Sequence, residues 1–313
     1  NWFASLDYRA KDEVDQFAML ITMYHYGFAG WSPYLIVAIA AGLASYRYDL
    51  PMTIRSTLYM ILGDYTWGWI GDVIDGFSIV FTVAGICTSL GLGAMQIITG
   101  SGRLGWLDTD ALSEDELTNK QVTVIWCITL VATISVVTGL DVGVKFLSQL
   151  GFGLGMILLI ACSAMEKTSF IYNLLCQTVG YYFQFGIFQV PFWTDAFGQL
   201  EDGEGRDPLD QSAASWWMNG WTVFYMAWWT AWGAFVGLFV ARISRGRTIR
   251  EIVLYVFVAP LLYNFLWFCS FGGMGIRQAR QAEELEYLGE EQFGDAAYFR
   301  DPNSDFCFNV PQQ

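Results

Sequence analysis

Long runs of hydrophobic residues that lack any ionisable side chain divide the sequence into predicted membrane-spanning helices. Each run has at least 20 residues, and a helix needs about 20 apolar residues to cross the hydrocarbon core of a bilayer. Five runs meet this length, at residues 76–100, 121–140, 146–165, 215–241 and 252–274. We therefore expect each of them to form a transmembrane helix.

Two further uncharged runs are less regular. The first, residues 17–46, contains only His25 as an ionisable group and is interrupted by glycines and by Pro33. We expect a span at about 31–47, with the preceding residues as its approach. The second, residues 168–194, is rich in Gln, Tyr and Phe, which is more typical of a helix that lies in the membrane interface. The pattern thus predicts about six spans, and residues 168–194 are not one of them.

Charged residues suggest an orientation and a second region. The short loop ARISRGRTIRE at 241–251 contains four arginines, and short basic loops favour the cytoplasmic side, or its organellar equivalent. Six spans would then place both termini on the opposite side. We expect a transmembrane region over residues 1–275 and an acidic extramembrane tail over 276–313, with a short helix at 282–288 (AEELEYL).

The composition agrees with a membrane protein. Hydrophobic residues make up 54% of the 313 residues and charged residues 15%, against about 25% charged in soluble domains. The aromatic content of 17% argues against intrinsic disorder. The net charge of -14 argues against nucleic acid as a partner, because phosphate binding needs a basic surface. We expect an all-α integral membrane protein of the plasma membrane or of an organelle inner membrane, in contact with lipids.

Few residues are suited to catalysis. The chain has one histidine, no carboxylate within the predicted spans and no nucleophile motif, so we expect neither an enzyme nor a cofactor or metal site. His25 more often has a structural, hydrogen-bonded role than that of a proton relay. The six cysteines show no spacing that indicates pairing. Gly151 and Gly155 have the spacing that favours close helix packing.

The chain begins at Asn1, without a methionine or a signal peptide. We therefore expect it to be a portion of a longer protein or a processed product.

Aromatic residues form a stripe on one predicted helix. They recur at steps of three and four, which places them on one helix face, with Trp229 beside it. The stripe consists of Trp221, Tyr225, Trp228, Trp232 and Phe235. An interfacial belt does not explain the deeper tryptophans. Two interpretations remain: packing in the core, or a cavity that binds a quaternary ammonium group through cation-π attraction.

The stretch WTVFYMAWWTAWGAFVGLFVARISRGRTIRE at 221–251 resembles the signature of the betaine/choline/carnitine transporter (BCCT) family. MYHYGFAGWSPY at 23–34, FTVAGICTSLGLGAMQI at 81–97 and SFGGM at 270–274 are similar to further helices of that family. The similarity covers about residues 17–275 and corresponds to helices four to nine of the family. It implies a LeuT-like fold of two five-helix inverted repeats, of which this chain holds an incomplete part.

The resemblance also implies a function and a set of sites. The function is secondary transport of quaternary-ammonium solutes such as glycine betaine, choline or carnitine by alternating access. The implied substrate-binding positions are Tyr26, Trp31, Tyr34, Trp228, Trp229 and Trp232. Tyr26 stands where a tryptophan is usual, Met226 replaces another aromatic residue, and Ala231 and Ala234 replace a serine and a proline.

Sodium-coupled members of the family use two threonines on the fifth helix and a phenylalanine on the eighth. Thr82 and Phe235 match an ion-binding role, but Ile86 stands at the second threonine position. A methyl-rich side chain cannot ligate a hard cation, which prefers oxygen, and this argues against sodium coupling at the site.

Two functions from different classes remain open. One is a transporter whose missing helices come from the rest of a longer chain, from a homo-oligomer or from other membrane subunits. The alternative is a transporter-derived, non-transporting structural subunit of a larger membrane complex, which Ile86 and the missing helices favour.

Overall fold

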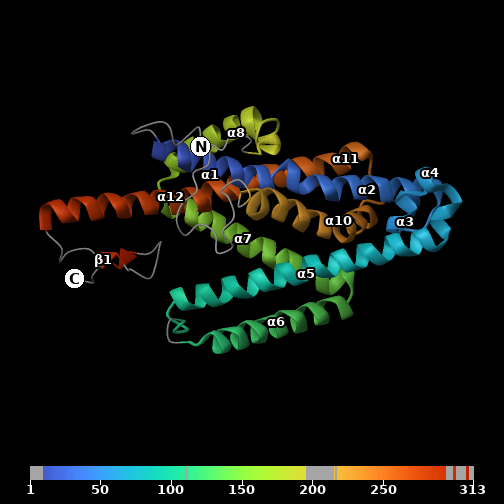
Figure 1. The fold of residues 1–313 in the computed structure, drawn as a ribbon, viewed down its shortest axis with the longest axis horizontal. Coiled ribbons are helices and arrows are strands. Elements are labelled where there is room, and N and C mark those ends of the chain that lie inside the picture. The colour runs from blue at the N-terminus through green and yellow to red at the C-terminus, as the bar shows by residue number, and fades with distance from the viewer. Residues whose placement is uncertain are drawn as a thin grey trace. The chain divides into compact units, whose positions relative to one another are not determined.

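The computed structural model describes residues 10–109, 112–194, 215, 217–293, 299–300 and 308–309, and most of these residues are helical (Figure 1). The α-helices are α1 (Ala10–Tyr26), α2 (Phe28–Tyr48), α3 (Ile54–Thr57), α4 (Tyr59–Leu62), α5 (Trp69–Arg103), α6 (Glu114–Val137), α7 (Lys145–Met165), α8 (Thr168–Tyr181), α10 (Phe224–Ile243), α11 (Ile249–Val253) and α12 (Ala259–Phe293).

Shorter elements join or extend these helices. The 3-10 helices are η1 (Gly63–Trp67) and η4 (Val190–Phe192). The π-helical segments are η2 (Leu140–Val144), η3 (Tyr182–Gly186), η5 (Met218–Val223) and η6 (Leu254–Val258). The strands β1 (Phe299–Arg300) and β2 (Phe308–Asn309) pair antiparallel, with Phe299 opposite Asn309.

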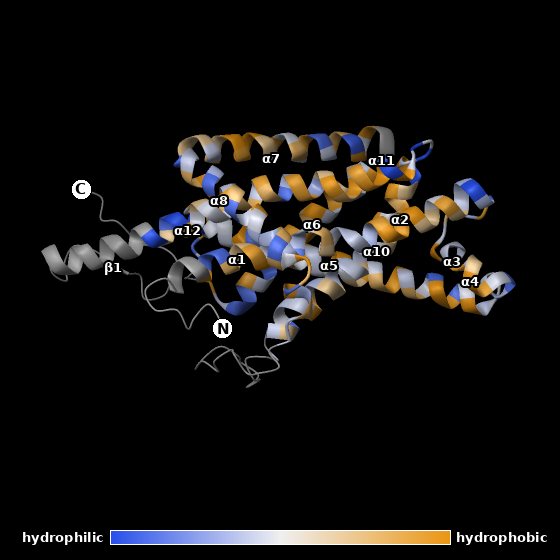
Figure 2. Ribbon diagram, turned by 90° about the horizontal axis from the view of Figure 1, so that it is seen from above, coloured by the Kyte–Doolittle hydropathy of each residue, from blue (hydrophilic) through white to orange (hydrophobic). Residues whose placement is uncertain are grey.

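In the described part of the chain, six helical stretches are long and apolar enough to cross a membrane, and they confirm the predicted number of spans. They are Val14–Tyr48, Trp69–Arg103, Glu114–Val137, Val142–Met165, Met218–Ile243 and Ile249–Arg280. The segment at 168–194 is not among them, as predicted. Figure 2 shows the hydrophobic residues that run along α2, α5 and α7. The protein is thus an all-α polytopic integral membrane protein.

The first span is longer than expected. The sequence predicted a span at about 31–47, but the apolar helical stretch begins at Val14. Gly27 interrupts it for a single residue, and α2 begins at the next one. Pro33 leaves α2 intact although it has no N–H for the carbonyl of Ala29. The hydroxyl of Ser32 donates to that carbonyl oxygen at 2.9 Å instead, so the interruption is local.

The chain divides into two compact units. One contains residues 1–24, 157–201 and 262–313, and the other contains residues 25–156 and 202–261. All the predicted site residues belong to the second unit.

In the first unit, parts of α1, α8 and α12 pack together. Leu20, Tyr182 and Phe265 are buried, and the rings of Tyr182 and Phe265 meet edge to face at 5.4 Å. Ion pairs connect Asp15 with Arg280 and Glu166 with Arg277. Neutral hydrogen bonds add to them, from Gln16 to Thr178 and from Ser163 to Ser270. These contacts join helices that are distant in the sequence.

In the second unit, α10 packs against both α2 and α5, and α5 and α6 form an antiparallel pair (Figure 1). Small residues set the close approach of α10 to α2. A Cβ atom at Gly237 would lie 2.5 Å from the side chain of Val37, which is closer than atoms can pack. At the end of the same pair, the hydroxyl of Tyr46 donates to the carbonyl of Ala241 at 3.2 Å.

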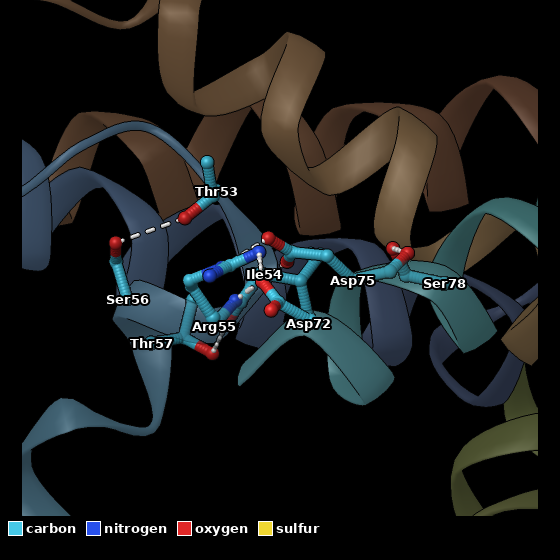
Figure 3. Close-up of polar contacts among 8 residues, drawn as sticks. All are labelled: Thr53, Ile54, Arg55, Ser56, Thr57, Asp72, Asp75 and Ser78. Atoms are coloured by element: carbon cyan, nitrogen blue, oxygen red, sulfur yellow. Dashed lines mark hydrogen bonds and ion pairs between the residues drawn. The ribbon is translucent and has the colours of Figure 1, made fainter. Parts of the chain in front are cut away.

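The segment between α2 and α5 is fixed to α5 by one arginine (Figure 3). Nε of Arg55 donates to Asp75 at 2.5 Å, the backbone N–H of Arg55 donates to the same carboxylate at 3.0 Å, and Nη2 lies 2.8 Å from Asp72. The hydrogen bond that Arg55 donates to the Asp75 carboxylate raises the pKa of Arg55 above its ordinary value. The guanidinium is therefore charged throughout the physiological pH range.

Two sequence expectations need correction. The spacing of Gly151 and Gly155 predicted close helix packing, but apart from its chain neighbours and the backbone of its own helix, no described atom lies within 4 Å of where a Cβ of Gly151 would be. The predicted short helix at 282–288 is not separate, because α12 continues without a break to Phe293. A helix already nucleated by the span extends at little cost. The boundary at 276 between membrane region and tail stays a prediction.

The five described cysteines are free, in agreement with the sequence. They are Cys87, Cys127, Cys162, Cys176 and Cys269. Cys307, the sixth, lies outside the described residues.

Candidate functional site

Trp229, in the middle of α10, is fixed to the end of α1. Its indole N–H donates to the carbonyl oxygen of His25 at 2.8 Å. That carbonyl lies in the last turn of α1, where carbonyl groups lack their usual partner four residues ahead. Gly30 makes the approach possible, because a Cβ atom there would lie 2.6 Å from the His25 oxygen and 3.3 Å from Nε1 of Trp229.

The two neighbouring tryptophans share one acceptor on α5. The indole N–H groups of Trp228 and Trp232 both donate to the hydroxyl of Ser89, each at 3.1 Å. One turn before Ser89, Gly85 leaves room for the ring of Trp232, since a Cβ atom at Gly85 would lie 3.2 Å from Nε1 of that ring. All three indole donors of this part of α10 are thus bound to the protein itself.

Ring contacts extend this group towards the end of α1. The rings of Trp228 and Trp229 are nearly parallel, at 7° and 5.0 Å between centroids. Tyr26 meets Trp229 edge to face at 5.3 Å and Tyr225 at 5.7 Å. His25 is buried, and its ring lies 4.5 Å from that of Tyr225. Its position within this aromatic packing agrees with the structural role expected from the sequence.

The remaining two predicted residues form a pair on α2. Trp31 and Tyr34 meet edge to face at 5.6 Å, and Tyr34 is buried. The contacts of the described residues therefore arrange the six predicted positions in two groups. Tyr26, Trp228, Trp229 and Trp232 are connected through ring contacts and Ser89, whereas Trp31 and Tyr34 contact each other.

The predicted ion-binding residues have contacts of another kind. The hydroxyl of Thr82 donates to the carbonyl of Ser78 within α5 at 2.8 Å. Phe235 is 52% exposed and its ring lies 5.9 Å from that of Trp232. Within the described part of the chain, no three His, Cys, Asp or Glu side chains cluster as metal ligands would.

A cavity of about 320 Å³ lies at the far end of the α2 and α10 pair. Arg47 and Arg247 line it together with Tyr46 and apolar residues such as Leu43 and Ile252. It contains none of the six predicted aromatic residues, so it is separate from the aromatic group.

Sequence reasoning missed three residues that shape the site: Ser89, Gly30 and Gly85. The run SLGLGAMQ at 89–96 is rich in small residues, and Ser89 begins it. Its role as a shared acceptor depends on the distance between α5 and α10, which no local pattern contains. The glycines are visible in the sequence, but what approaches them is not.

Comparison with known proteins identifies the family. The profile of the betaine/carnitine/choline family of transporters matches residues 7–299. A glycine betaine/proline/choline/ectoine transporter of Vibrio parahaemolyticus is 37% identical over 266 residues, which are 85% of this chain and 43% of that protein. The high-affinity choline transport protein of Escherichia coli K12 is 38% identical over 264 residues, 84% of this chain and 36% of that protein. This chain therefore spans less than half the length of these relatives, and it belongs to the betaine/carnitine/choline transporter family.

Proposed function

We propose that this chain forms part of a secondary transporter for quaternary-ammonium solutes such as choline, glycine betaine or carnitine. In this proposal it supplies an aromatic portion of the substrate site, and further helices complete the alternating-access machinery. Membership of the family and the names of its relatives, choline and glycine betaine transporters, support the solute class. The six aromatic residues are proposed as the substrate-binding set.

The observation that carries the proposal is the way the tryptophans of α10 are held. Each of the indole N–H groups of Trp228, Trp229 and Trp232 has a hydrogen-bond acceptor within the protein. A buried indole N–H usually finds an acceptor, and here the acceptors also fix the orientation of the three rings. Held indoles have a fixed ring face, and each face attracts a trimethylammonium group by about 0.5 to 2 kcal/mol.

Equilibrium binding of choline and glycine betaine to the protein purified from its native membrane tests this proposal. Replacing Trp229 by Leu keeps an apolar side chain but removes the ring, so binding should weaken by about 2- to 30-fold. Trp126→Leu on α6 is the control, because Trp126 is 71% exposed. Thermal stability is recorded for both variants.

The result distinguishes binding from packing. Weaker binding by Trp229→Leu with a melting temperature near that of Trp126→Leu supports the substrate site. Absence of binding by the wild type, together with a loss of stability in Trp229→Leu alone, would contradict the proposal and support core packing.

One observation favours the second candidate, a structural subunit of a larger membrane complex. None of the residues of α6 is buried in the described structure, although the helix is apolar enough to span a membrane. Its surface is thus available to lipids or to further helices. Solute binding separates the candidates, since both can copurify with partner chains after detergent extraction but a structural subunit should bind no solute.

A further inference from the structure

We infer that Ser89 determines substrate selectivity at the aromatic site by occupying the indole donors of Trp228 and Trp232. This inference rests on the proposed function, because it concerns which quaternary-ammonium solutes the site prefers. Ser89 on α5 shapes the chemistry of the ring surface on α10, because two hydrogen bonds meet at its oxygen atom.

The hydrogen bonds leave these tryptophans without a free donor. An indole has one N–H group, and a hydroxyl oxygen accepts two hydrogen bonds. Ser89 accepts one from Trp228 and one from Trp232, each at 3.1 Å. The N–H of Trp229 is bound to the carbonyl of His25. The three rings can therefore offer a solute their faces, but not a hydrogen-bond donor.

The lack of a free indole donor affects selectivity because choline and glycine betaine differ at one end only. Both have a trimethylammonium group, which ring faces attract, whereas betaine alone has a carboxylate. An N–H group that donates to a carboxylate makes a stronger hydrogen bond than one between neutral groups. With both donors occupied by Ser89, this wall of the site gives the carboxylate no such bond. Ser89 thus keeps the wall from favouring betaine over choline.

The helix packing explains why one serine can serve two rings. Trp228 and Trp232 are four residues apart, so they lie one above the other on α10. Gly85 is one turn before Ser89 on α5, and the absence of its side chain leaves the space that the Trp232 ring occupies. Ser89 is half-buried. The acceptor is therefore placed by the approach of α5 to α10.

Ser89→Ala is the direct test. It removes the shared oxygen and frees both indole donors, so the ratio of betaine affinity to choline affinity should rise by about fivefold or more, the size of one net hydrogen bond. Ser89→Thr keeps a hydroxyl and should keep the wild-type ratio. Thr88→Ala is the matched control, since the hydroxyl of Thr88 donates to the carbonyl of Ala84 within α5.

A second measurement follows the hydrogen bonds without any solute. In protein labelled with 15N-tryptophan, the indole N–H signals of Trp228 and Trp232 should shift and exchange faster with solvent in Ser89→Ala. The signal of Trp229, whose acceptor is a backbone carbonyl, should stay in place and reports that the variant is folded.

The outcomes separate the inference from the proposed function. A raised betaine-to-choline ratio with shifted Trp228 and Trp232 signals supports the inference. A ratio equal to that of the wild type overturns the inference alone. Wild-type protein that binds neither solute overturns the inference and the proposed function together.

Discussion

The carbonyl oxygen of His25 and the indole N–H of Trp229 are joined by a hydrogen bond of 2.8 Å, although the two residues are 204 positions apart in the chain. The bond connects the interruption of the first span with the centre of α10. An interrupted helix has carbonyl groups without partners in its last turn. Here such a group is satisfied by a side chain of another helix, and the ring of that side chain is held in one orientation.

Gly30→Ala should break this relationship. The new Cβ would lie 2.6 Å from the His25 oxygen, a backbone atom that cannot move away cheaply, and 3.3 Å from Trp229. We expect a loss of about 1 to 3 kcal/mol in stability, the usual cost of overpacking, and weaker choline binding. The melting temperature of the solubilised protein and equilibrium binding measure the two effects.

Gly42→Ala on the same helix is the control for that experiment. Apart from its chain neighbours and the backbone of its own helix, no described atom lies within 4 Å of where its Cβ would be. Alanine favours a helix over glycine by about 1 kcal/mol, so this variant should be as stable as the wild type or more so. Equal melting temperatures for the two variants would contradict the tight contact at Gly30.

The carboxylates around Arg55 should contribute unequally. Asp75 accepts from both Nε and the backbone N–H of Arg55, and its side chain is 22% exposed, whereas that of Asp72 is 71% exposed. Solvent weakens exposed ion pairs. We expect Asp75→Asn to lower the melting temperature clearly more than Asp72→Asn does.

The pH range over which these ion pairs stabilise the protein follows from the pKa of Arg55. Its pKa is raised in the folded protein, so the contribution of the guanidinium is present at all pH values below its ordinary pKa and is lost only in strong alkali. Between neutral pH and pH 9, the difference between the Asp72 and Asp75 variants should therefore stay constant. A difference that disappears in this range would show that another group provides the stability.

Solute binding at this site should not depend on sodium. The hydroxyl of Thr82 donates within its own helix, and Ile86 provides no oxygen where a second ligand would be needed. Choline affinity should be the same in sodium chloride and potassium chloride of equal ionic strength. Sodium-dependent binding that Thr82→Ala abolishes would contradict this prediction.

The sequence predicted the helices well because burial in lipid depends on composition over a window of about 20 residues. The apolar runs at 76–100 and 252–274 each lie within an observed helical stretch. The aromatic spacing placed Tyr225 to Phe235 on α10, and Trp221 lies in the π-helical segment η5 that precedes it. The predicted start of the first span was wrong, because the boundary between α1 and α2 depends on a single residue. Gly27 stops α1, but one glycine does not decide whether a new helix starts immediately after it.

The hydrogen-bond partners of the site could not be predicted in the same way. The spacing of Trp228, Trp229 and Trp232 follows from helical geometry and is contained in the sequence. Their acceptors, Ser89 and the carbonyl of His25, are distant in the chain, and one of them is a backbone atom that every residue has. Which acceptor an indole reaches is decided by how closely α10 approaches its neighbours, and glycines such as Gly30 and Gly85 allow that approach only in the packed tertiary structure.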